Sequence, residues 1–175
     1  MVRAFIGIFL PENLRNKVVE IQKIVKTFPL KAKFVERENL HLTLSFLGEI
    51  DESEIKRISK ELDKICKEHE KFEVRIKNLI PIPSKNFIRV IAFKIESENL
   101  EEISKDIKKR IGGDIKPPHL TICRIKNVLK KEIVLKRMNE IEFDEKFLVN
   151  SIELIKSKLT QKGPIYSVIH ESKLK

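Results

Sequence analysis

His41-Leu42-Thr43-Leu44 and His119-Leu120-Thr121-Ile122 repeat one four-residue pattern in two otherwise different halves of the chain. In a β-strand, successive side chains point to opposite faces, so the His and Thr of each copy project together while the residues between and after them face a core. Each copy therefore predicts a strand that presents one imidazole and one hydroxyl. Because the copies lie far apart in the sequence, only a tertiary fold can bring them together.

The residues around the first motif predict how that strand is oriented. The apolar members of the alternation are Leu40, Leu42, Leu44 and Phe46, and the polar members are His41, Thr43 and Ser45. This period of two predicts a strand with one buried face. We therefore expect Phe46 in the core and Ser45 on the outer face beside Thr43.

Apolar periodicity divides the chain into strands and helices. Strands are expected where apolar residues alternate or form short runs, and helices where they recur every three or four positions. The predicted strands or extended segments cover residues 2–9, 33–46, 72–76, 87–95, 119–125, 147–159 and 165–170. The predicted helices begin near Pro11, after Asp51–Ser53 and after Ser97, where Gly112-Gly113 supplies the end, and a shorter helix covers residues 131–139.

The order of these elements predicts the fold class. No linker divides the chain, and short connections such as residues 160–164 join neighbouring strands. Paired strands backed by helices indicate an α+β fold that is bilobal, with two antiparallel sheets facing across a central cleft and helices on the outside. We expect residues 1–175 to form a single bilobal domain in which the two motif strands face one another.

Composition narrows the class of partner. Lys and Arg outnumber Asp and Glu by 36 to 26, a formal charge of +10 that favours an anionic partner such as nucleic acid. The basic residues are interspersed with acids, so a solvated surface is an equally good interpretation. The apolar stretch from Val2 to Leu10 is shorter than the roughly 20 residues of a membrane helix and lacks the frame of a secretory signal. We expect a soluble, cytoplasmic protein without a membrane partner.

Two imidazoles on facing strands indicate acid–base chemistry. A histidine near its ordinary pKa of about 6.5 can take or give a proton at neutral pH, and cleaving a phosphodiester needs both acts. The hydroxyls of Thr43 and Thr121 can donate to the phosphoryl oxygens. This scheme requires neither a metal nor a cofactor, and it predicts a bell-shaped pH profile. His69 and His170 lack the repeated frame and are expected to be structural.

The two cysteines leave one rival mechanism open. Cys66 and Cys123 form no Cys-x-x-Cys pair, so neither a disulfide framework nor a structural zinc site is indicated. Cys123 shares strand parity with His119 and Thr121, and a thiol nucleophile with an imidazole base would need that parity. No third residue that would orient such a pair is evident in the sequence.

The paired motifs resemble the two His-x-Thr-x signatures of the two-histidine phosphoesterases, especially the LigT-like RNA 2′,3′-cyclic phosphodiesterases, also called 2′-5′ RNA ligases. The similarity covers nearly the whole chain. It extends to residues 3–6, 34–40, 45–49, 157–160 and 162–166. Tyr166, the single tyrosine, falls in the last of these segments, where stacking near the site and packing on a strand are both open.

This resemblance implies the hydrolysis of RNA 2′,3′-cyclic phosphate ends to 2′-phosphomonoesters, a step in RNA processing. By analogy, His41 is the proton donor and His119 the proton acceptor, while Thr43, Thr121 and Arg124 bind the substrate. Arg124 would need a bulge or a strand end, because simple alternation places it with Leu120 and Ile122. The implied partners are RNAs with 2′,3′-cyclic phosphate or 2′-phosphate ends, with tRNA fragments as one candidate, and a monomer is expected.

Two other functions remain open at this stage. The same histidines could join RNA ends through 2′-5′ linkages if a 5′-hydroxyl took the place of water. A basic bilobal protein could also bind RNA or a nucleotide without turnover. Incubation of a nucleoside 2′,3′-cyclic phosphate with the protein and excess chelator separates the enzyme from the passive binding module.

Overall fold

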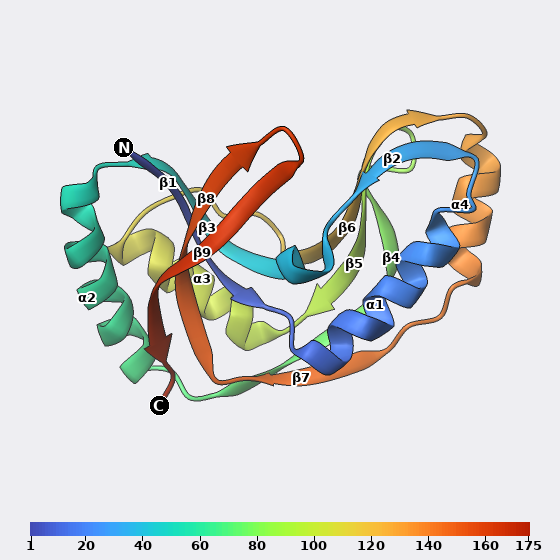
Figure 1. Ribbon diagram of the computed structural model, residues 1–175. Coiled ribbons are helices and arrows are strands. Elements are labelled where there is room, and N and C mark those ends of the chain that lie inside the picture. Colours follow the sequence, from blue (N-terminus) through green and yellow to red (C-terminus); the bar gives the residue numbers. More distant parts are fainter.

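The computed structural model describes residues 1–175 as two antiparallel sheets with four α-helices (Figure 1). The strands are β1 (Val2–Phe9), β2 (Leu30–Phe34), β3 (His41–Ile50), β4 (Phe72–Pro83), β5 (Ile88–Glu96), β6 (His119–Val128), β7 (Glu145–Val149), β8 (Ser151–Thr160) and β9 (Gly163–Lys173). The helices are α1 (Glu12–Val25), α2 (Ile55–Lys67), α3 (Glu98–Arg110) and α4 (Lys131–Glu140), with short 3-10 turns η1 (Arg37–Asn39) and η2 (Glu52–Glu54). No helix is long and apolar enough to cross a membrane.

The two sheets form two lobes, as the sequence predicts. One sheet has the strand order β3-β1-β8-β9 and the other the order β2-β6-β5-β4-β7, and every pairing is antiparallel. The motif strands β3 and β6 contact each other where the lobes meet, and the helices lie on the outside (Figure 1). The predicted α+β class and bilobal architecture are confirmed.

The helices link the lobes because each of two helices covers the sheet of the opposite half. α1 follows β1 of the four-stranded sheet but packs beside β6 of the five-stranded sheet. α3 follows β5 of the five-stranded sheet but packs on β3. Gln22 of α1 is buried, and its side-chain amide donates to the carbonyls of Val35 and Ile122 at 3.0 and 2.9 Å.

The helix ends agree with the sequence signals. Ser97 accepts a hydrogen bond from the backbone N–H of Leu100, which is the arrangement of an N-cap. Asp51 accepts from the N–H of Ser53 but opens η2, so α2 begins four residues later. Gly112 and Gly113 follow α3 with positive φ angles of 116° and 94°, a conformation that glycine adopts without steric cost.

A β-bulge interrupts the alternation of each motif strand. In β3, Ser45 pairs with Ile6 and Thr43 pairs with Gly7, so Leu44 is the extra residue. An extra residue in one strand shifts every later side chain to the opposite face. Leu44 and Ser45 are both buried, and Phe46 emerges with 41% of its surface exposed.

Two predictions are therefore wrong at this bulge. Ser45 lies inside rather than beside Thr43, and its hydroxyl donates to the carbonyl of Gly112 at 2.8 Å. Phe46 lies outside rather than in the core, where Lys116 sits over its ring at 5.4 Å. Apolar and polar residues alternate without a break through Leu44, so the sequence pattern does not reveal that this residue is the extra one.

The predicted strand over residues 147–159 is two strands that belong to different sheets. β7 pairs with β4 in the five-stranded sheet, whereas β8 pairs with β1 in the four-stranded sheet. Asn150 separates them. The buried positions change from odd numbers in β7 to even numbers at the start of β8, and this change of parity is a signal that the sequence analysis missed.

Candidate active site

Both motif histidines occupy the first position of their strand. His41 begins β3 and His119 begins β6, and both side chains are half-buried. The Nδ1 atom of His41 lies 2.6 Å from the carbonyl oxygen of Asn39, and that of His119 lies 2.9 Å from the carbonyl oxygen of Pro117. A carbonyl can only accept, so each Nδ1 carries a proton and donates it. Each imidazole therefore keeps Nε2 as the atom that can exchange a proton with a substrate.

His41 lies in an aromatic environment. Its ring centroid lies 4.8 Å from that of Phe5, 5.1 Å from that of Tyr166 and 6.4 Å from that of Phe9. Tyr166 comes from β9 and thus brings the end of the chain to the first motif. Of the two interpretations left open for Tyr166, the structure favours a position beside the motif histidine.

Burial lowers the pKa of His41 from its ordinary value to about 4. A hydrogen bond to the carbonyl of Asn39 acts in the opposite direction, and the positive charges of Arg124 and His119 lower the pKa further. Desolvation disfavours the charged imidazolium, and like charges add to that effect. Since Arg124 and His119 both act on His41, β6 brings its motif residues into the electrostatic range of the first motif.

The threonines lie beside their histidines on the same strand faces. The hydroxyl of Thr43 lies 3.1 Å from Nε2 of His41, so it can donate a hydrogen bond to this nitrogen. Thr121 is half-buried and lies opposite Ala92 of β5. The hydroxyl of Thr43 therefore lies next to the proton-exchanging nitrogen of His41, and Thr121 holds the equivalent place in the second motif, two residues after His119.

A second bulge accounts for the position of Arg124. In β6, Cys123 pairs with Ile91 and Thr121 pairs with Ala92, so Ile122 is the extra residue. Ile122 and Cys123 are both buried, and Arg124 returns to the face of Thr121. The side chain of Arg124 is exposed and forms no ion pair with a carboxylate. The sequence analysis required such a bulge for Arg124 to face the site.

The thiol mechanism finds no support in the structure. The bulge turns Cys123 into the core, where it is fully buried. Burial raises the pKa of this thiol to about 12, so the nucleophilic thiolate does not form near neutral pH. The prediction that Cys123 points to the same strand face as His119 and Thr121 is wrong, because counting alternate residues assumes a strand without a bulge.

The other two histidines lie away from the motifs in ion pairs. Nε2 of His69 lies 3.1 Å from a carboxylate oxygen of Asp106, and Nε2 of His170 lies 2.8 Å from one of Asp63. The first pair links the segment after α2 with α3, and the second links α2 with β9. Both contacts support the structural role expected for these residues.

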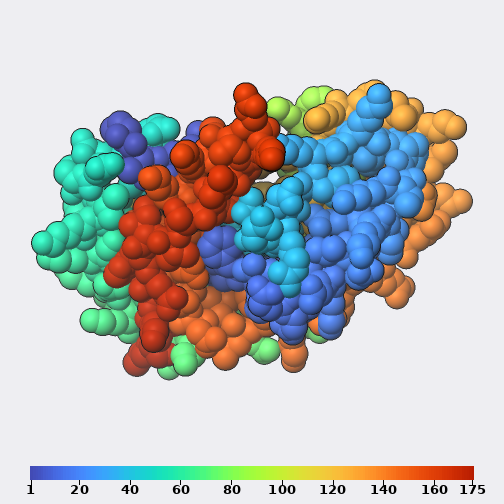
Figure 2. All heavy atoms as spheres, viewed as in Figure 1, coloured from blue at the N-terminus to red at the C-terminus, as the bar shows by residue number.

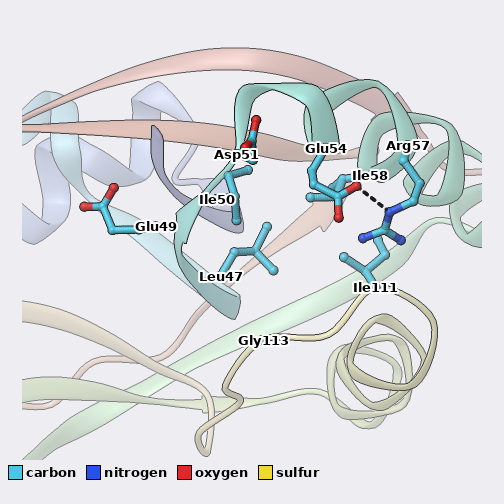
Figure 3. Close-up of a pocket in the computed structure, with 9 residues that line it drawn as sticks. All are labelled: Leu47, Glu49, Ile50, Asp51, Glu54, Arg57, Ile58, Ile111 and Gly113. Carbon is cyan, nitrogen blue, oxygen red and sulfur yellow. Dashed lines mark hydrogen bonds and ion pairs between the residues drawn. The ribbon is translucent and has the colours of Figure 1, made fainter. Parts of the chain in front are cut away.

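One pocket lies away from the motifs, along the C-terminal half of β3 (Figure 3). It has a volume of about 320 Å³, and Glu54 and Arg57 form an ion pair of 3.0 Å on its wall. None of the motif histidines, motif threonines or Arg124 lines it. We therefore place the candidate active site at the paired motifs on chemical grounds rather than at this pocket. No group of three or more His, Cys, Asp or Glu side chains is arranged to hold a metal ion.

Comparison with known proteins defines the class of enzyme. The model of the LigT like Phosphoesterase family matches residues 8–92 and 94–166. An RNA 2′,3′-cyclic phosphodiesterase of Methanocaldococcus jannaschii is 38% identical, covering 97% of this chain and 99% of the relative. One of Aquifex aeolicus with the same name is 34% identical, covering 98% and 96% of the two chains. The protein is thus an enzyme of the phosphoesterase class.

Solved structures agree with this assignment. A crystal structure of a Thermus thermophilus protein superposes with a TM-score of 0.85 at 26% identity, covering 98% of this chain and 97% of the other. E. coli LigT in complex with 3′-AMP shares the fold, with a TM-score of 0.75 at 20% identity, covering 99% of this chain and 98% of the other. The chain belongs to the LigT-like family of two-histidine phosphoesterases, and the resemblance of its paired motifs to that family is confirmed.

Proposed function

We propose that the protein hydrolyses RNA 2′,3′-cyclic phosphate ends to 2′-phosphomonoesters with His41 and His119 as its acid and base. The observation that carries the proposal is the matched placement of the two histidines, each at the start of a motif strand with Nδ1 tied to a carbonyl and Nε2 available. Relatives named RNA 2′,3′-cyclic phosphodiesterase over nearly the whole chain support the substrate class. We further propose that residues 1–175 act as one domain and as a monomer, with tRNA fragments among the candidate substrates.

The proposed reaction is a single displacement at phosphorus. Nε2 of His119 removes a proton from water, and the water oxygen forms a bond to phosphorus. The bond between phosphorus and the 3′ oxygen breaks, and Nε2 of protonated His41 gives its proton to that oxygen. The product carries a 2′-phosphate and a free 3′-hydroxyl.

The remaining site residues stabilise the phosphoryl group. The hydroxyls of Thr43 and Thr121 donate to the non-bridging oxygens, where negative charge grows in the transition state. The Thr43 hydroxyl then exchanges its contact with His41 for one with the substrate. Arg124 supplies a cation on the same face, and a guanidinium can donate two hydrogen bonds to a phosphate.

Substrate binding supplies the acid form of His41 in this mechanism. The pKa of about 4 keeps the ring of His41 neutral at pH 7. An anionic phosphate placed next to the ring favours the imidazolium and raises that pKa. The proton donor is therefore formed in the complex with substrate.

Replacement of each motif histidine tests the proposal. We expect His41→Ala and His119→Ala each to reduce the hydrolysis of a nucleoside 2′,3′-cyclic phosphate by at least about 100-fold, since a positioned acid or base contributes about that much. His69→Ala is the matched control, because His69 lies in an ion pair away from the motifs. The assay contains excess chelator, and circular dichroism verifies folding. A large loss in only one of the two variants would contradict the two-histidine scheme, and no product from the wild type would contradict the enzyme itself.

A further inference from the structure

A basic surface lies beside the candidate active site, at the free edge of the five-stranded sheet. Strand β2 pairs only with β6, so its other side is a sheet edge. A pocket of about 460 Å³ opens there. It is lined by Lys26, Leu30, Lys31, Ala32, Phe34 and Lys126. We call these residues together with Lys33 the β2 edge.

The lysines of the β2 edge have no acidic partners. None of them forms an ion pair, whereas the lysines that do are Lys17, Lys23, Lys64, Lys77, Lys94 and Lys146. No Asp or Glu lines the pocket. Lys26 instead lies 5.1 Å from the ring centroid of Phe34. An unneutralised cluster of cations attracts an anionic ligand.

The β2 edge is continuous with the candidate active site. Lys33 is the cross-strand partner of Arg124, so the two side chains share one face of the sheet. The ammonium of Lys33 also lies next to Gly163 of the β8–β9 hairpin, 3.4 Å from where a Cβ on that glycine would be. Figure 2 shows this hairpin against the segment that leads from β2 to η1. Lys33 thus stands between the site and the open edge.

The cations continue outward from this point. Lys31 lies on the same face as Lys33, two residues further from Arg124, and a strand rises about 3.3 Å per residue. Lys126 and Lys26 then border the pocket around Phe34. Cations along a path, with an aromatic ring and apolar side chains between them, match the surfaces on which single-stranded nucleic acids bind.

We propose that the β2 edge binds the nucleotides immediately 5′ of the terminal cyclic phosphate, so that the protein recognises an RNA strand rather than a mononucleotide. This inference rests on the proposed function. The phosphates of the strand contact Lys33, Lys31, Lys126 and Lys26 in turn, and a base lies against Phe34. An acidic protein is the alternative ligand for this surface. It would not explain why the cations continue directly from Arg124, the residue that we propose contacts the scissile phosphate.

A triple variant tests the β2 edge while it leaves the motifs intact. For Lys26→Ala/Lys31→Ala/Lys126→Ala we expect kcat/KM to fall about 10-fold on a short oligonucleotide with a 2′,3′-cyclic phosphate end, since three phosphate contacts are lost. On a nucleoside 2′,3′-cyclic phosphate, kcat/KM stays within about twofold of the wild type because the contacts to the terminal phosphate are unchanged. The slope of log kcat/KM against log salt for the oligonucleotide becomes shallower by about 2, at about 0.7 per phosphate of a single strand.

The matched control is Lys56→Ala/Lys60→Ala/Lys108→Ala, which removes the same charge from exposed lysines of α2 and α3. An equal loss in this control, or equal losses on both substrates, would overturn the inference. Inhibition of the wild type by polyglutamate as strongly as by polyuridylate would also overturn it, because the edge would then be a general anion surface. If the wild type cleaves neither substrate, the proposed function itself fails.

Discussion

His41 is the residue whose surroundings are most informative about the reaction. Its ring lies among Phe5, Phe9 and Tyr166, and its pKa falls to about 4 through burial. A low pKa suits a base, yet the family resemblance gives His41 the role of acid. The two statements agree if the negative charge of the bound substrate raises the pKa of His41, so that the ring takes up a proton from solvent, and this condition can be measured.

The titration of His41 should depend on the ligand. In the free protein we expect an NMR midpoint at about 4. A bound nucleotide 2′-phosphate should move that midpoint upward, because its negative charge stabilises the imidazolium. The signal of His41 is assigned as the one that is absent from the spectrum of His41→Gln. A midpoint that stays low in the complex would exclude His41 as the proton donor.

The same pKa predicts how acid affects stability. An unfolded His41 titrates at about 6.5, so below that pH the unfolded chain binds a proton that the folded protein does not. The contribution of His41 is fully present above about pH 6.5 and is lost as the pH falls toward about 4. Urea unfolding should show a smaller loss over this range for His41→Gln than for the wild type. Parallel losses in the two proteins would contradict the pKa.

At the scale of the elements, the sequence predicts the helices and the motif strands but not the bulges. Ser97 and the apolar spacing behind Pro11 are local signals, and the helices begin where these signals indicate. Arg124 reaches the active face only because Ile122 is an extra residue in β6. The extra residue is defined by the pairing of β6 with β5. This pairing joins distant parts of the chain, so local alternation in the sequence does not reveal it. Phe5 and Phe9 escaped notice for a related reason, since β1 is apolar on both faces.

The loop before β6 depends on one glycine. Gly113 has a φ of 94°, and a Cβ there would lie 2.1 Å from the hydroxyl of Ser45 and 2.8 Å from the carbonyl oxygen of Phe46. That loop is tied to β3 because Phe46 and Asp114 exchange two backbone hydrogen bonds of 2.8 Å. We expect Gly113→Ala to reduce the free energy of unfolding by more than the roughly 1–3 kcal/mol that a residue strained at positive φ costs.

Gly112→Ala is the matched control for this loop. Gly112 has a φ of 116°, but nothing lies within 4 Å of the position of its Cβ. Its replacement introduces strain without a clash, so the loss of stability should be smaller than for Gly113→Ala. Equal melting temperatures of the two variants would show that the loop accommodates a Cβ at position 113 without a further loss of stability.

At the scale of the whole molecule, the lobes are joined by helices that cover the opposite sheet. The sequence predicts the two sheets and their helices, but it does not indicate which helix covers which sheet, since an apolar face does not identify its partner. Gln22 is the buried polar residue that fixes one of these crossings. Its side chain bonds to β6 of the five-stranded sheet, whereas its helix, α1, follows β1 of the four-stranded sheet.

Removal of this amide should weaken the attachment of the lobes. We expect Gln22→Ala to lower the free energy of unfolding by about 1–3 kcal/mol, since the carbonyls of Val35 and Ile122 lose their donor. Urea unfolding followed by circular dichroism measures the change. Gln161→Ala, in the exposed β8–β9 turn, is the control and should match the wild type. A Gln22→Ala variant as stable as the wild type would show that the crossing is held by apolar packing alone.

The order of strands in the first sheet also constrains how the enzyme matures on the ribosome. β1 and β3 are translated well before β8 and β9, which complete their sheet. Tyr166, which lies against His41, belongs to that final strand. A nascent chain therefore exposes a half-built sheet until β8 and β9 have been synthesised, and the first motif gains its full surroundings only when these strands join the sheet.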